Sequence, residues 1–177
     1  LQNAGIRFPW PMASWIGGVA ALWIIGAFES LLNQTVALVA FIPIIMGMGG
    51  NVGIQTSTII VRGIATGHVI LEEVSKVNFK EIRVGIILGL VYGMLLGVLV
   101  YFHFVQYHSP FMLGLVVEIP IFTSMSIACL VASVFPILLE KVNIDPAIST
   151  GPFVTTAIDI IGIYSYFLIA GSLLPLK

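Results

Sequence analysis

The stretch that decides the fold lies at residues 84–104, which read VGIILGLVYGMLLGVLVYFHF. No Asp, Glu, Lys or Arg interrupts these 21 residues, and a membrane-spanning helix needs roughly 20 mostly apolar residues. One face of the expected helix carries small residues at four-residue spacing, namely Gly85, Gly89, Gly93 and Gly97. We expect this face to pack closely against another helix within the membrane.

Four further apolar stretches share this character, and together the five predict an all-α polytopic membrane protein. We expect five transmembrane helices per subunit in one domain that covers residues 1–177. Continuous apolar runs of this length exclude a transmembrane β-barrel, whose strands alternate apolar and polar residues. The expected spans are residues 12–32, 36–61, 84–104, 111–139 and 152–174.

The composition of the whole chain supports the same class. Hydrophobic residues make up 59% and charged residues 8% of the 177 residues, and the mean hydropathy is +1.12. Because a soluble domain usually has about 25% charged residues, a soluble enzyme is excluded. Seven Lys and Arg residues against eight Asp and Glu residues leave no basic patch, so nucleic acid is not an expected partner.

The positions of Lys and Arg predict the orientation, because positive residues favour the cytoplasmic side. Six of the seven fall on one side of the expected spans and one on the other. We therefore expect a multi-pass protein of the plasma or inner membrane, with a cytoplasmic N-terminus and an external C-terminus. The six are Arg7, Arg62, Lys76, Lys80, Arg83 and Lys141, of which the middle four are expected in the loop between spans two and three, and the seventh is Lys177.

Acidic side chains at membrane depth are costly and usually functional. From the ~1.5 Å rise per helical residue, Asp159 on span five and Asn51 on span two are both expected roughly 10–12 Å from the cytoplasmic side. Glu29 and Glu118 are expected nearer the outer face, and Asp145 in an inner loop. Asp159 and Asn51 are therefore the candidates for one shared polar level.

Spans two and five contain unusual residues around this level. Four glycines within residues 47–53 favour an interrupted helix. In span five, Pro152 is expected to start the helix. Thr155, Thr156 and Asp159 follow on neighbouring helical faces. Carboxylate, hydroxyl, amide and free carbonyl oxygens are the ligands that a hard divalent cation or its water shell accepts.

Structural interpretations of the same residues stay open at this point. Asp159 could bond to Ser or Thr on a neighbouring helix, and Asn51 could be a polar contact between helices. Asp145, which precedes a proline, could cap span five. Cys129 is interpreted as a small buried apolar residue, and the histidines lack the spacing of metal ligands.

Two long stretches resemble signatures of the MgtE family of magnesium channels. Residues 43–57 read PIIMGMGGNVGIQTS and are followed by Arg62–Gly63, and residues 145–159 read DPAISTGPFVTTAID. Arg7 before Pro9–Trp10, and Glu29 late in the first span, are also similar to the family. The resemblance covers the membrane domain only, so we expect a soluble magnesium-sensing regulatory domain to be missing from this chain.

The resemblance implies a homodimer whose ion path follows the two-fold axis between the second and fifth helices of both subunits. Asp159 would form the main carboxylate pair across the axis. Mg²⁺ would be the transported ion and ligand, rather than a cofactor of catalysis. The implied metal ligands are Asp159, Asn51, Thr155, Thr156, Asp145 and Glu29, and the implied lining residues are Gly49, Gly50, Gln55, Gly151 and Pro152.

Magnesium sheds water reluctantly, so paired carboxylates would hold the hydrated ion through its waters. An ion-coupled secondary transporter is the main alternative, since Glu29, Glu118 and Asp159 could relay protons. A third possibility is an intramembrane enzyme or an assembly subunit. The sequence has no HExxH motif and no pair of aspartates at membrane depth, so we expect no enzymatic activity. Selectivity among Mg²⁺, Mn²⁺, Co²⁺ and Ca²⁺ does not follow from oxygen ligands alone.

Overall fold

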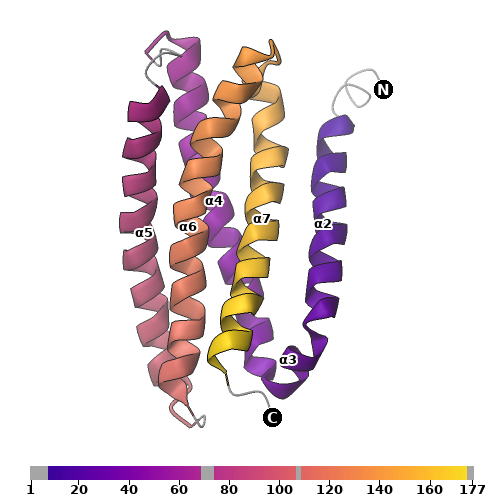
Figure 1. The fold of residues 1–177 in the computed structure, drawn as a ribbon, viewed down its shortest axis with the longest axis vertical. Coiled ribbons are helices and arrows are strands. Elements are labelled where there is room, and N and C mark those ends of the chain that lie inside the picture. Colours follow the sequence, from indigo (N-terminus) through magenta and orange to yellow (C-terminus); the bar gives the residue numbers. More distant parts are fainter. Residues whose placement is uncertain (1–7, 69–73, 107–108, 175–177) are drawn as a thin grey trace.

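The structure is a computed structural model that describes residues 8–68, 74–106 and 109–174, and those residues form a helical bundle (Figure 1). Four helical segments among them are long and apolar enough to cross a membrane, and residues 11–27 form a shorter apolar helix. The chain is therefore a multi-pass membrane protein. The helices are α2 (Pro9–Ala27), α3 (Glu29–Gln34), the 3₁₀ helix η1 (Val36–Phe41), α4 (Ile42–Ala65), α5 (Val74–His103), α6 (Pro110–Lys141) and α7 (Pro146–Leu173).

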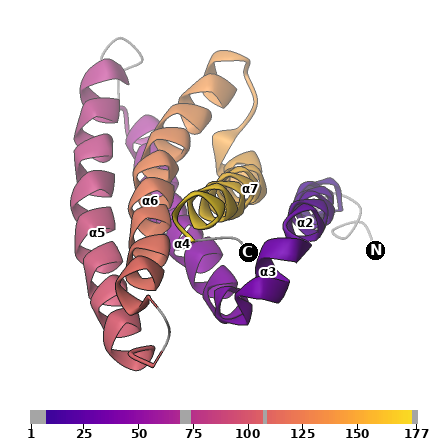
Figure 2. The ribbon, with the colours of Figure 1, turned by 60° about the horizontal axis from the view of Figure 1, so that its bottom comes forward.

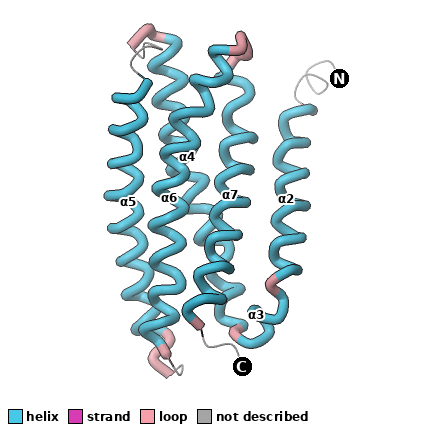
Figure 3. Tube along the Cα trace, in the orientation of Figure 1, coloured by secondary structure: helices cyan, strands magenta, loops and turns pink. Residues whose placement is uncertain are grey.

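The bundle has two ends, at which its connections gather (Figure 3). One end holds the α4–α5 and α6–α7 connections and the start of α2, and we call it the basic end because Arg62, Lys76 and Lys141 lie there (Figure 1). The α5–α6 connection and the last residues of α7 lie at the opposite end. Helix α5 lies at the edge of the bundle against α6, whereas α7 lies between α6 and α2 (Figures 1 and 2).

The first expected span, residues 12–32, is not one helix. Helix α2 ends at Ala27, and Phe28 leaves helical geometry with φ −104° and ψ 17° before α3 begins. The ring of Phe28 stacks on Phe167 of α7, with the ring centroids 5.0 Å apart. This aromatic contact lies at the break between α2 and α3. That the first span crosses the membrane stays a prediction.

The second span is also built differently from the expectation. Residues 36–41 form a 3₁₀ helix, and α4 then continues without interruption from Ile42 to Ala65. The prediction of a break at the glycines is wrong, because Gly49 and Gly53 are buried against Ile158 of α7, where a Cβ would have no room. Pro43 lies in the first turn of α4, where its missing N–H costs no hydrogen bond.

Helices α5 and α6 pack along the glycine row, as the sequence predicts. A methyl group at Gly89 would lie 2.9 Å from the carbonyl oxygen of Phe122, and one at Gly93 would lie 2.8 Å from that of Glu118. Helix α6 matches the expected span 111–139 closely. Helix α5 begins ten residues before the expected residue 84, so the stretch with Lys76, Lys80 and Arg83 is helical rather than a loop.

Helix α7 begins at Pro146 rather than at the expected residue 152, so Pro152 lies inside the helix. The prediction that Pro152 starts the helix is wrong because an earlier residue supplies the cap. Oδ1 of Asp145 accepts a hydrogen bond from the backbone N–H of Ala147 at 2.9 Å. The capping interpretation of Asp145 is therefore confirmed.

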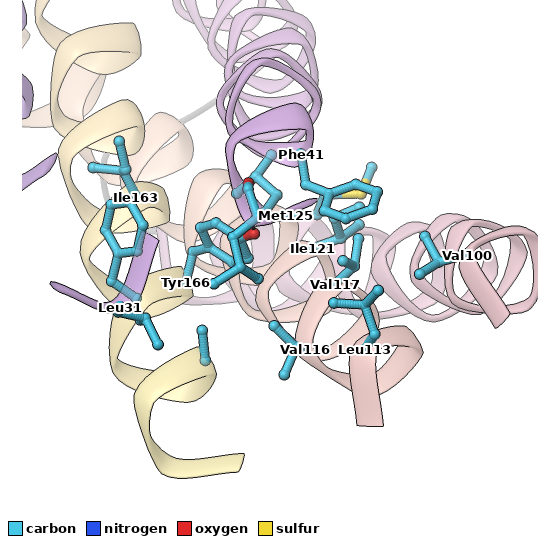
Figure 4. Close-up of a cluster of buried hydrophobic side chains, with 14 of the residues drawn as sticks. Leu31, Phe41, Val100, Leu113, Val116, Val117, Ile121, Met125, Ile163 and Tyr166 are labelled. Atoms are coloured by element: carbon cyan, nitrogen blue, oxygen red, sulfur yellow. Dashed lines mark hydrogen bonds between the residues drawn. The ribbon is translucent and has the colours of Figure 1, made fainter. Parts of the chain in front are cut away.

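The apolar core joins the long helices near the end opposite the basic end. Side chains from η1, α6 and α7 converge there, with Tyr166 beside Met125 (Figure 4). The hydroxyl of Tyr166 donates a hydrogen bond to the backbone oxygen of Leu38 at 2.8 Å. This hydrogen bond joins η1 to α7, the helix that carries Asp159. It therefore fixes the start of α4 relative to α7.

The glycine row makes one stability prediction. Gly89→Ala should lower the free energy of unfolding by about 1–2 kcal/mol, because the new methyl group meets backbone atoms of Phe122 that cannot move aside alone. Gly18→Ala is the matched control, since a Cβ at Gly18 meets nothing within 4 Å. Thermal unfolding in detergent should separate the two variants, and equal melting temperatures would contradict the packing argument.

Candidate functional site

The site begins with Asp159, which lies on α7 where that helix packs against α4. The carboxylate is partly buried, and its Oδ1 lies 3.7 Å from the position that a Cβ on Gly50 would occupy. Asn51 is the next residue of α4, so the predicted common level of Asn51 and Asp159 is confirmed. Gly50 leaves room beside the carboxylate that a larger side chain would fill.

Asn51 and Gln55 lie on a different side of α4 from Gly50. Both are exposed, and both line a hollow of about 230 Å³ between α4 and α5. The remaining lining residues of this hollow are Met48, Val52, Leu88, Tyr92 and Met125. Within one copy, the structure therefore places the amides at the level of Asp159 but on the α5 side of α4.

The two threonines before Asp159 have separate contacts. The hydroxyl of Thr155 donates to the backbone oxygens of Gly151 and Pro152 at 3.0 and 3.2 Å. The hydroxyl of Thr156 donates to Oγ of Ser14 at 3.4 Å, and its methyl group packs on Gly17. Thr156 therefore faces α2, and the Thr155 oxygen keeps its lone pairs available to a cation or its water.

A second hollow of about 320 Å³ lies between α4 and α7 at the basic end. Gly151, which the resemblance implied as a lining residue of the ion path, lines this hollow. The sequence analysis used Arg62 for the orientation and for the family resemblance and missed its place in this hollow, although its position at the end of span two pointed there. The lining residues are Ile54, Ser57, Thr58, Val61, Arg62, Ala65, Pro146, Ala147 and Gly151.

The other predicted site residues have different surroundings. Glu29 begins α3, is exposed, and lies at the end opposite the basic end. Gly49 is buried against Ser124 and Ile158, so in one copy it is a packing residue. Pro152 is partly buried within α7. Arg7 lies outside the described residues.

One copy supplies few ligands at this level. Among the described residues, no three His, Cys, Asp or Glu side chains lie close enough together to hold a metal ion. The donors near Asp159 are oxygen atoms, which suit hard cations such as Mg²⁺. A single carboxylate and neutral oxygens favour weak binding of a hydrated cation over tight coordination of a resident metal.

The sequence analysis missed a buried acid, Glu81. It is 7% exposed and lies on α5, in the stretch that was expected to be a loop. The hydroxyl of Thr56 on α4 donates to its Oε2 at 3.2 Å and lies 3.5 Å from Sγ of Cys129 on α6. Glu81 precedes Gly85 by four residues, so extending the glycine row by one turn would have placed it between the helices.

Fold and site together define a multi-pass helical membrane protein with oxygen-bearing residues at membrane depth between two of its helices. The family model described as "MgtE: Divalent cation transporter" matches residues 42–169, which include α4, α5, α6 and most of α7. The chain belongs to the MgtE family.

Three relatives named magnesium transporter MgtE are similar over nearly the whole chain. The Bacillus subtilis protein is 33% identical over 164 residues, which are 93% of this chain and 36% of the relative. The Thermus thermophilus protein is 34% identical over 168 residues, 95% of this chain and 36% of the relative. The Enterococcus faecalis protein is 31% identical over 170 residues, which are 96% of this chain and 37% of the relative. The chain thus spans little more than a third of each relative's length.

Proposed function

We propose that this chain transports Mg²⁺ across a membrane, as a non-enzymatic divalent cation channel. The observation that carries the proposal is the position of Asp159, a partly buried carboxylate at membrane depth beside the small residue Gly50. An acidic group at that depth is costly unless a cation or another polar group meets it. Membership of a family described as divalent cation transporters, and relatives named magnesium transporters, support Mg²⁺ as that cation.

The path is proposed to lie between two copies of the chain, along their two-fold axis. Asn51, Gln55 and Ile54 are exposed on α4 in one copy, and amides facing lipid would be unfavourable. A second copy that covers this surface would bring two Asp159 carboxylates and four amides to one path.

Within this path each residue has a proposed role. The Asp159 pair attracts the hydrated ion and offsets the cost of moving a divalent charge into a low-dielectric region. Asn51, Gln55 and Thr155 accept hydrogen bonds from the waters of the ion. Binding through water stays weak enough for the ion to leave, which conduction requires. The hollow beside Gly151 is the proposed mouth at the basic end.

Some predicted residues receive smaller roles. Asp145 adds negative charge near the mouth while it caps α7, and Glu29 lies near the other opening. Gly50 and Gly151 line the path, and Pro152 and Gly49 set the packing of its walls. The basic end is proposed to face the cytoplasm, because it collects most of the Lys and Arg residues.

Flux measurements on the purified chain in liposomes test this function. Mg²⁺ entry should follow the Mg²⁺ gradient and the voltage, and it should not respond to proton or sodium gradients. Mn²⁺, Co²⁺ and Ca²⁺ measured in the same vesicles would establish the selectivity. Flux driven by a proton or sodium gradient would favour the coupled transporter. No flux from a folded dimer would overturn the proposal and favour an assembly subunit.

A further inference from the structure

A groove between α5 and α6 near the end opposite the basic end contains an acid that the ion path does not use. It has a volume of about 220 Å³, and Glu118 lies in it. Its other lining residues are aromatic, aliphatic or glycine, and none of the lining residues is basic. They are Gly97, Val98, Tyr101, Phe102, Phe111, Gly114 and Leu115.

The Glu118 side chain reaches toward the end of the bundle. Its backbone oxygen lies opposite Gly93, whereas its Oε2 lies 2.9 Å from the position of a Cβ on Gly97, one turn further along α5. Gly97 therefore makes the room into which the carboxylate extends. A charged group at membrane depth is costly, and pointing it toward the interface lowers that cost.

The level of this carboxylate in a bilayer follows from helix lengths. Helix α5 has 30 residues, about 45 Å at ~1.5 Å per residue, which matches the ~40–45 Å of a bilayer with its headgroups. Gly97 precedes the last residue of α5, His103, by roughly 9 Å. The headgroup layer is ~5–8 Å thick on each side, so the carboxylate lies close to the boundary between headgroups and hydrocarbon.

We propose that this groove binds a phospholipid with a primary ammonium headgroup, of the phosphatidylethanolamine class. A single carboxylate matches one monovalent cation, whereas a divalent ion would lack further charged ligands there. A primary ammonium donates hydrogen bonds to a carboxylate, and aromatic rings around the groove, such as those of Tyr101 and Phe102, attract the same cation. The groove volume of about 220 Å³ is several times the ~30 Å³ that one water molecule occupies. The groove therefore has room for a small headgroup.

The groove lies on the α5–α6 side of the bundle, away from Asp159 between α4 and α7. Its occupant therefore does not depend on the proposed ion path. The exposed apolar face of α5 toward the bilayer centre, which includes Leu95 and Val98, would contact the acyl chains. Lipids without a cationic group, such as phosphatidylglycerol, should find only repulsion from Glu118.

Lipid titration of the purified full chain, followed by native mass spectrometry, tests the proposal. Phosphatidylethanolamine should bind about tenfold more tightly than phosphatidylglycerol, and Glu118→Gln should remove most of that preference. Glu140→Gln is the matched control, because it removes the same charge at the other end of α6. Gly97→Ala should reduce the preference too, with Gly18→Ala as its control.

The outcomes are distinguishable from misfolding, because thermal unfolding without added lipid should be similar for Glu118→Gln and the unaltered chain. Phosphatidylcholine, whose quaternary ammonium cannot donate a hydrogen bond, should bind more weakly than phosphatidylethanolamine. Equal binding of phosphatidylethanolamine by Glu118→Gln and the unaltered chain would overturn the proposal. Tighter binding of phosphatidylglycerol than of phosphatidylethanolamine would also overturn it. An equal loss of the phosphatidylethanolamine preference in Glu140→Gln would do the same.

Discussion

Asp159→Asn is expected to reduce Mg²⁺ flux into liposomes on the order of a hundredfold while leaving a folded protein. The amide has nearly the shape of the carboxylate, so it fits the same space beside Gly50. The negative charge that offsets the cost of a divalent ion at membrane depth is lost. In the proposed homodimer the substitution removes two charges at once, which makes this the largest functional effect that we expect.

The control for this variant is Glu140→Gln, which removes an acidic charge near the end of α6 and is not among the residues that line the proposed mouth. It should keep nearly normal flux at the same level of reconstituted protein. Native mass measurement should show that both variants keep the oligomeric state of the unaltered chain. Normal Mg²⁺ flux through Asp159→Asn would remove Asp159 from the ion path.

The same variant separates a channel from a coupled transporter. If Asp159 exchanged protons during a transport cycle, the amide would abolish the response to a proton gradient, whereas slow exchange down the Mg²⁺ gradient could continue. In a channel the amide weakens the binding of the ion itself. Flux through Asp159→Asn should therefore fall by a similar factor whether a Mg²⁺ gradient, a voltage or a proton gradient is imposed.

The long helices could be predicted because their signals are local. Residues 84–104 are apolar for the length of a bilayer, and the glycine row within them defines the face that packs on α6. The break at Phe28 and the early start of α5 depend on contacts with distant residues. Phe28 stacks on Phe167, and Glu81 is stabilised within the bundle by Thr56 of another helix.

The common level of Asn51 and Asp159 was predictable from the sequence, whereas the direction of their side chains around the helix axes was not. The rise per residue places Asn51 and Asp159 at one level, and the contact of Asp159 with the Gly50 position agrees. Successive helical residues differ by about 100° around the axis, so the direction of each side chain depends on the rotation of α4 about its own axis. That rotation is set by the packing of Gly49 and Gly53 against α7. The sequence pattern of α4 alone could not specify this packing.

The buried contact between α4 and α5 has a direct consequence for stability. Glu81 is a carboxylate inside the bundle, and the Thr56 hydroxyl donates to it at 3.2 Å. Leaving a buried charged group without its donor costs more than the hydrogen bond adds when it is present. The Thr56 side chain also lies one residue beyond Gln55, so the contact holds the helix that carries the proposed path.

Thr56→Val should therefore lower the free energy of unfolding by about 2–3 kcal/mol, because valine keeps the shape of threonine and removes the donor. Thr58→Val is the matched control on the same helix, since Thr58 is exposed and donates to Ile54 of its own helix. It should change stability by less than about 0.5 kcal/mol. In Glu81→Gln, Thr56→Val should cost less, because no buried charge is left without a donor. Equal effects of Thr56→Val in both backgrounds, measured by reversible unfolding in detergent, would show that its cost does not come through Glu81.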